Sequence, residues 1–359
     1  MNHPSKGVFS ELAKAYLEGK DSAFLPEILE MALNVSEAEL LLALPCSPDD
    51  AAKRIGITHD FAFNALEELY KRGFVLRKES AGEIVYALVN DLLDFLLHDK
   101  QIFGRLKDEN NRSRFLDLCD SMFEKELSLD EKWSRQIVPQ VRVIPIEKTI
   151  SMKWGEVLPL ESASAIIDSA STIAQTECTC RVMARNCDNP TDVCILFDDY
   201  AKIFIDRGAG RRITKEEAFE ILERSERLGL IHHLNNSDSS GMEFMCSCCT
   251  CCCIVLRGMV ILGKSDICYK SRYLSESNPE RCTGCGKCIE RCRFDAISLL
   301  GDKAVVDDAK CFGCGLCVSI CSENAIELVC VKGPEHITDH LIGTPDDTVE
   351  DLMIMKKHS

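Results

Sequence analysis

Cysteine is the residue type in this chain with the most chemistry to offer, and its positions are strongly uneven. The chain has 359 residues and 22 cysteines, and the stretch MCSCCTCCC at 245–253 holds six of them. In a reducing compartment, clustered thiols bind metals or carry redox chemistry more often than they form structural disulfides. The pattern therefore indicates sites at which several thiolates bind metal together.

The most specific cysteine spacing lies toward the C-terminal end of the chain. A C-x2-C-x2-C-x3-C pattern at 282–292 recurs 29 residues later at 311–321, and the phrases RFDAISL and SENAIEL follow the two copies. The duplicated segment resembles the bacterial two-cluster ferredoxins over 278–329. Paired zinc sites are the alternative, and each would need four thiolates.

The ferredoxin resemblance implies two 4Fe-4S clusters with crossed ligands. In such a duplication three thiolates of one loop bind one cluster, and the fourth ligand comes from the other repeat. The implied ligand sets are Cys282, Cys285, Cys288 and Cys321 for one cluster, and Cys311, Cys314, Cys317 and Cys292 for the other.

A second, less familiar group of thiols precedes this tail. Its ten members are Cys178, Cys180, Cys187, Cys194, Cys246, Cys248, Cys249, Cys251, Cys252 and Cys253. A helix is expected between the two halves of the group, because Thr214 and Glu217 form a capping box and Gly229 can end the helix. Such a helix can fold the two halves onto each other. We expect one or two further iron-sulfur clusters here; a zinc or copper thiolate site is the alternative, since soft thiolates also select those metals.

The order of these segments also carries a resemblance. The run from VLPLESASAIIDSAS through ECTCR to the cysteine-dense stretch and the duplicated tail resembles a poorly characterised family of anaerobic ferredoxin-like proteins. That resemblance implies iron-sulfur binding and no defined reaction. We predict no catalytic residue, and we interpret His232 and His233 as surface or core histidines.

The first hundred residues show helix signals followed by a hairpin signal. Ser47 is a candidate N-cap for a helix that ends near Gly56, and a second helix should run from Thr58 to Gly73. Apolar and polar residues then alternate over 74–89, as in a two-stranded wing. Over about 60 residues this order resembles the winged-helix family.

The charge of the second helix decides how that resemblance is interpreted. It presents Asp60, Glu67 and Glu68 against Lys71 and Arg72, whereas helices that read DNA normally present basic and amide groups. We expect this segment to pack or to dock protein, and DNA is not an expected partner. The net charge of -16 agrees, because unspecific binding to phosphates requires a surplus of lysine and arginine.

Together these patterns predict an α+β protein with a winged-helix-like N-terminal domain, a helical cysteine-rich middle domain and a ferredoxin-like tail domain. The predicted divisions are 1–100 for the winged-helix-like domain, 101–150 for a helical segment and connector, 151–275 for the middle domain, 276–330 for the dicluster domain, and 331–359 for an acidic tail.

The predicted function is low-potential electron transfer, one electron at a time, to or from a partner oxidoreductase. The alternatives are an iron-sulfur redox-sensing transcriptional regulator and a reductase whose middle cysteine site binds substrate. The start of the chain shows no leader pattern, and no apolar run near the cysteines reaches the length of a membrane span. We therefore predict a cytoplasmic protein with redox partner proteins; the sequence indicates no oligomeric state.

Overall fold

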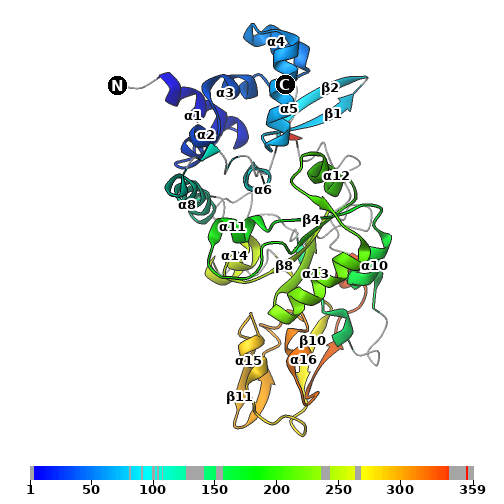
Figure 1. The fold of residues 1–359 in the computed structure, drawn as a ribbon. Helices are drawn as coiled ribbons and strands as arrows, with labels where there is room; N and C mark the ends of the chain where they lie inside the picture. The colour runs from blue at the N-terminus through cyan, green and yellow to red at the C-terminus, as the bar shows by residue number, and fades with distance from the viewer. Residues whose placement is uncertain are drawn as a thin grey trace.

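The computed structural model describes residues 4–80, 82–89, 92–98, 102, 105–106, 108–126, 141–150, 157–235, 243–262, 268–338 and 353–354. Figure 1 shows three regions in succession, with the N-terminal helices at one end, a central sheet, and the cysteine-rich tail at the other end. Helices and strands are both abundant, so the predicted α+β class is confirmed.

The N-terminal region begins with helices whose ends follow the sequence signals. Its elements are α1 (Pro4–Tyr16), α2 (Leu25–Ala32), α3 (Val35–Leu42), α4 (Pro48–Ile55), α5 (His59–Lys71), β1 (Val75–Ser80) and β2 (Glu83–Val89). The Ser47 hydroxyl accepts a hydrogen bond from the Asp50 N–H at 3.3 Å, and α4 ends at Gly56 in the left-handed conformation. The predicted helices and hairpin are present at these positions.

A third strand extends this hairpin. β14 (Met353–Ile354) pairs antiparallel with β2, with Met353 opposite Val89, so part of the predicted acidic tail returns to the first region.

Two further helices, α6 (Leu92–Leu97) and α8 (Glu109–Lys125), follow the hairpin. Cys119 of α8 is fully buried, and burial raises the pKa of its thiol. This cysteine is part of the hydrophobic core.

The middle region corrects one prediction, because it is built on a sheet rather than on helices alone. Seven strands lie in the order β6-β4-β5-β8-β7-β3-β9, and only β3 and β9 pair in parallel. Their bounds are β3 (Val141–Val143), β4 (Ile173–Thr176), β5 (Cys194–Phe197), β6 (Arg211–Arg212), β7 (Ile231–Asn235), β8 (Phe244–Cys248) and β9 (Cys268–Tyr269). The strands are short and mostly buried on both faces, so they lack the alternation that reveals a strand in a sequence.

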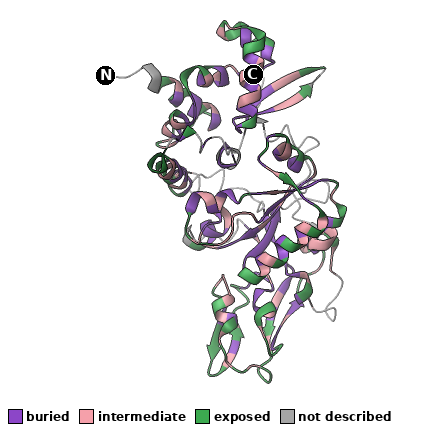
Figure 2. Ribbon diagram, in the orientation of Figure 1, coloured by how far each residue is buried: buried purple, intermediate pink, exposed green. Residues whose placement is uncertain are grey.

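Helices cover this sheet on both faces. They are α10 (Ala163–Ser169), α11 (Thr179–Ala184), α12 (Asp198–Asp206), α13 (Lys215–Leu228) and α14 (Ile254–Leu262), with short 3-10 turns at Glu147–Thr149 and Pro159–Glu161. Ile195 of β5 packs in the core formed with α10 and α13, whereas the adjacent Leu196 packs in the core shared with α12 and the N-terminal helices. The capping box of α13 is formed as predicted. Figure 2 shows the buried strands at the centre of the molecule.

The tail consists of two antiparallel strand pairs and three short helices. Its elements are β10 (Tyr273–Ser277), α15 (Lys287–Arg291), β11 (Ile297–Leu300), β12 (Lys303–Val306), α16 (Leu316–Ile320), β13 (Ile326–Cys330) and α17 (Glu335–Thr338). β10 pairs with β13, and β11 pairs with β12. The two copies of the sequence repeat therefore give two copies of the same unit, in which a cysteine-bearing loop leads into a short helix and then a strand.

Candidate metal centres

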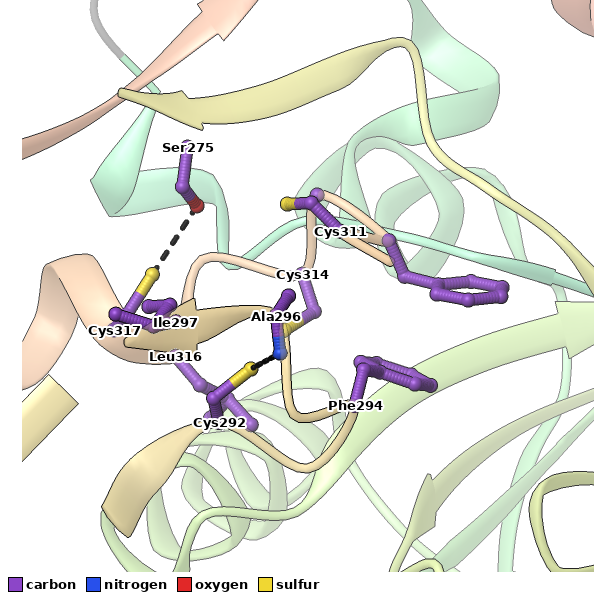
Figure 3. Close-up of a pocket in the computed structure, with 11 residues that line it drawn as sticks. Ser275, Cys292, Phe294, Ala296, Ile297, Cys311, Cys314, Leu316 and Cys317 are labelled. Carbon is purple, nitrogen blue, oxygen red and sulfur yellow. Dashed lines mark hydrogen bonds between the residues drawn. The ribbon is translucent and has the colours of Figure 1, made fainter. Parts of the chain in front are cut away.

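One half of the tail cysteines lines a cavity beside the middle region. Cys292, Cys311, Cys314 and Cys317, which we call the proximal tail set, surround this cavity together with Phe294 (Figure 3). Hydrogen-bond donors point at the sulfur atoms. The hydroxyl of Ser275 lies 3.1 Å from the Cys317 Sγ, and the Ala296 N–H donates to the Cys292 Sγ at 3.4 Å.

The other half lines a second cavity, and its cysteines are more exposed than those of the proximal tail set. Cys282, Cys285, Cys288 and Cys321 form this distal tail set, and Cys285 is exposed. Backbone N–H groups again donate to sulfur, from Ala304 to the Cys282 Sγ at 3.4 Å and from Ala325 to the Cys321 Sγ at 3.3 Å. The structure thus brings each crossed set of four cysteines together around its own cavity.

The sulfur atoms of each tail set are spread too widely for three of them to bind one metal ion, as expected of ligands that surround a cluster. In a 4Fe-4S cluster each thiolate binds a different iron, so the four sulfurs surround a core instead of contacting one another. All eight tail cysteines are among the described residues, and no three of their sulfur atoms lie within 4.8 Å of one another. A methyl group at Gly313 would lie 2.1 Å from the Tyr273 carbonyl oxygen, so the loop that carries Cys311 and Cys314 packs tightly against the start of β10.

The ten middle cysteines converge as predicted from the intervening helix, but they divide into two unequal sets. The smaller one, the four-thiol site, consists of Cys187, Cys249, Cys251 and Cys252, and its four Sγ atoms all lie within 4.8 Å of one another. The Cys187 Sγ is 3.7 Å from the Sγ atoms of both Cys249 and Cys252, and the Sγ atoms of Cys251 and Cys252 are 3.9 Å apart.

The six other thiols of the middle region form a closed ring. Each side chain interacts with two neighbours, in the order Cys178, Cys180, Cys253, Cys248, Cys246, Cys194 and back to Cys178. We call this arrangement the six-thiol ring. Its members come from the start of α11, from β5, from β8 and from the turn before α14.

The pKa shifts of the thiols alternate in direction around the six-thiol ring. Hydrogen bonds from two neighbours lower the pKa of each of three thiols, which favours the thiolate: Cys178, Cys246 and Cys253. The three donors between them have raised pKa values for the same reason: Cys180, Cys194 and Cys248. Because a metal binds the thiolate form, loading the ring with all six ligands must release these donor protons.

A histidine completes the lining of the six-thiol ring. Strand pairing places His233 opposite Cys246 and His232 opposite Ser247, so the two histidines face opposite sides of the sheet. The His233 Nε2 is 2.9 Å from the Cys248 Sγ and 3.7 Å from the Cys253 Sγ. Sequence analysis missed this contact, although the alternation of strand side chains could have indicated it had the partner strand been known.

His232 lies on the opposite face of the sheet from His233. Its Nδ1 lies 3.0 Å from the Ser247 hydroxyl, and burial lowers its pKa to about 4. It therefore stays neutral at physiological pH.

Arg181 of α11 is also buried. It donates to the Ser247 carbonyl at 3.0 Å, and the Cys249 Sγ lies 3.8 Å from its guanidinium. Arg181 thereby places a permanent positive charge beside the thiolates of the four-thiol site.

An apolar core joins the six-thiol ring to the proximal tail set. Cys248 and Cys253 of the ring pack in the same buried cluster as Phe312 and Leu316 of the tail. Cys314 packs against that cluster, and its carbonyl accepts a hydrogen bond from the Ile146 N–H at 3.0 Å. The distal tail set has no ligand in this cluster. Its ligands line a cavity with Leu299 of the hairpin β11–β12, which Figure 1 places at the end of the molecule away from the N-terminal helices.

No helix in the described part of the chain is both long enough and apolar enough to span a membrane.

Comparison with known proteins supports the metal-binding interpretation of the tail. Residues 275–322 match the family model described as a 4Fe-4S dicluster domain, and this segment contains both tail sets. No curated protein matches the chain. Residues 275–322 of the tail thus carry a 4Fe-4S dicluster domain, and the middle region adds groups of thiols spaced closely enough to hold a metal ion.

Proposed function

We propose that this protein transfers low-potential electrons from a partner protein, through its tail, to an iron-sulfur centre held by the six-thiol ring. A 4Fe-4S cluster, when bound, takes up and releases one electron at a time. The observation that carries the proposal is the apolar core in which ring residues Cys248 and Cys253 pack with Phe312 and Leu316 of the tail. The ligand sets are thereby held in a fixed series within one folded unit.

The exposure of the ligands supports a direction for this series. Cys285 of the distal tail set is exposed, whereas Cys311 and Cys317 of the proximal set are each 6% exposed. In the ring, Cys248 and Cys253 are 2% and 3% exposed. A partner can approach the distal set directly, while the ring is shielded from water, and exclusion of water is one of the controls on the potential of a cluster.

The N-terminal region supports this arrangement as a packing element. The Arg77 Nη2 lies 2.7 Å from the Asp206 carboxylate of α12, and the Arg207 Nε donates to the Tyr70 carbonyl at 3.1 Å. The two regions also share a hydrophobic core. We propose that its winged-helix-like segment docks the cysteine-rich region or a protein partner and does not read DNA. Thiolate ligands must stay reduced, which supports a reducing compartment such as the cytoplasm as the proposed location.

Metal analysis of the anaerobically purified protein tests whether the ring holds iron. The tail should contribute about eight iron atoms, and a cluster in the six-thiol ring should raise the total to about twelve or more. Replacing Cys248 by Ala should remove the additional iron and leave the spectrum of the tail clusters unchanged. A total of about eight iron atoms in the unaltered protein would contradict the proposal, and would leave the tail as the only electron-carrying part.

A further inference from the structure

The four-thiol site has a geometry different from that of the two tail sets. Its sulfur atoms approach one another to 3.7, 3.7 and 3.9 Å across the three measured pairs. The tail cysteines, by contrast, form no group of three sulfurs within 4.8 Å. The sulfur atoms of the four-thiol site are too far apart for disulfide bonds, which join sulfur atoms at about 2.05 Å. They are also closer together than the tail sulfurs, each set of which surrounds a cavity.

The observed separations match those around one tetrahedral ion. Zinc binds thiolate sulfur at about 2.3 Å, and in a regular tetrahedron the ligands are then separated by about 3.8 Å. We propose that Cys187, Cys249, Cys251 and Cys252 bind a single zinc ion, separate from the iron-sulfur centres of this protein. This proposal does not depend on the electron-transfer function.

The surroundings of the four-thiol site suit a closed tetrathiolate ion. Four thiolates and one Zn²⁺ carry a net charge of about -2, and hydrogen bonds to sulfur together with a nearby cation offset that charge. The Asn189 Nδ2 donates to the Cys187 Sγ at 3.3 Å, and the guanidinium of Arg181 lies 3.8 Å from the Cys249 Sγ. Cys249 and Cys252 are 5% and 1% exposed, and the other two thiols of the site are half-buried. The four thiolates can supply all four positions of a tetrahedral ion.

The location of the site gives the ion a structural role. Cys187 lies in the loop after α11, and the other three ligands lie in the turn between β8 and α14. Ring residues lie in or directly beside both segments: Cys180 is in α11, just before the loop, and Cys253 is in the turn. The Asn186 side chain also donates to the Cys251 carbonyl at 2.9 Å, which aligns the loop with the turn. A redox-inert ion would hold these segments together without taking part in electron transfer.

Zinc analysis and X-ray absorption of the anaerobically purified full chain, produced in medium containing both iron and zinc, test the assignment. We expect about one zinc per chain, with four sulfur neighbours at about 2.3 Å. Cys187→Ser and Cys251→Ser alter half-buried ligands and should each reduce the zinc content at least about tenfold while the iron of the tail stays bound. Cys330→Ser alters a half-buried cysteine outside all four sets and should retain the zinc.

Three results would overturn the zinc assignment. The first is that the unaltered protein contains no zinc and that the Cys251→Ser variant contains about four iron atoms fewer than it, because that would place a cluster at the four-thiol site. The second is one iron with a tetrathiolate spectrum in place of zinc. The third is zinc retained in both variants. The absorption measurement on the unaltered protein decides the coordination even if a variant fails to fold.

Discussion

At the scale of single residues, hydrogen bonds to sulfur distinguish the ligand sets. The tail thiols receive backbone N–H groups from residues such as Ala296 and Ala304, whereas the six-thiol ring receives the imidazole of His233. A hydrogen bond to a thiolate disperses its negative charge and therefore favours the reduced, more negative state of a bound cluster. His233 should thus raise the reduction potential of the ring centre.

Replacing His233 by Leu should lower that potential. If the hydrogen bond is stronger in the reduced state by about 1.4 kcal/mol, the potential falls by on the order of 60 mV. A redox titration followed by low-temperature spin resonance would measure the shift. His233→Gln, which can still donate, should recover part of the potential. His232→Leu is the matched control, because His232 lies on the opposite face, and an equal shift in both Leu variants would contradict a specific role for His233.

At the scale of elements, the hairpin β11–β12 offers an apolar surface beside the distal tail set. Leu299, Leu300 and Val305 are 41%, 76% and 43% exposed, and Leu299 also lines the cavity of the distal set. Exposed apolar groups of this kind are common where a partner protein docks. The hairpin therefore belongs to the surface through which we expect the electron partner to act.

Replacing Leu300 by Glu should weaken docking of the natural electron donor. A charged side chain would have to lose its water at the interface, and we expect the second-order rate of tail reduction by the donor to fall about tenfold, which corresponds to about 1.4 kcal/mol. The rate of tail reduction by dithionite, a small reductant that needs no docking surface, should be unchanged. Val260→Glu changes a 57% exposed apolar residue of α14 and serves as the control. Equal slowing with dithionite would show that the hairpin itself had been damaged.

The local elements could be predicted from sequence, but their pairing could not. The Ser47 cap, the Gly56 terminus and the α13 capping box are signals within a few residues, and they appear in the structure as expected. The seven-stranded sheet was missed because its contacts are distant in sequence: Ile195 of β5 pairs with Met245 of β8. Nothing between those two positions specifies their register.

The same limit applied to the metal centres. The repeat spacing was sufficient to group the tail cysteines, because each loop brings three of its ligands within seven residues. In the middle region, Cys187 and Cys194 are close in sequence but belong to different sets, and so do Cys252 and Cys253. In the turn after β8, Cys249, Cys251 and Cys252 belong to the four-thiol site, whereas Cys248 before them and Cys253 after them belong to the ring. His233 was missed for the same reason, since its neighbour Cys248 is brought close by strand pairing.

At the scale of the whole molecule, the tail is fixed to the middle region by more than the shared apolar core. Arg272, just before β10, is 4% exposed, and its Nε and Nη2 both lie 2.8 Å from the same carboxylate oxygen, the Oε2 of Glu161. A buried, two-point ion pair of this kind fixes orientation, because either partner alone would be an uncompensated charge. The proximal tail set and the six-thiol ring are therefore held in one relative position, as an internal electron path requires.

The order of electron transfer is tested most directly by following reduction of the ring centre when the proximal tail cluster is removed. Rapid-freeze spin resonance, after mixing with a low-potential donor protein under anaerobic conditions, would record tail and ring reduction separately. Cys314→Ala should abolish the proximal cluster, keep the ring metal bound, and slow ring reduction by at least about tenfold. Cys330→Ala is the control and should reduce at the original rate. If the ring of the Cys314→Ala protein is also reduced at the original rate, electrons reach it by another path and the proposed series of centres is wrong.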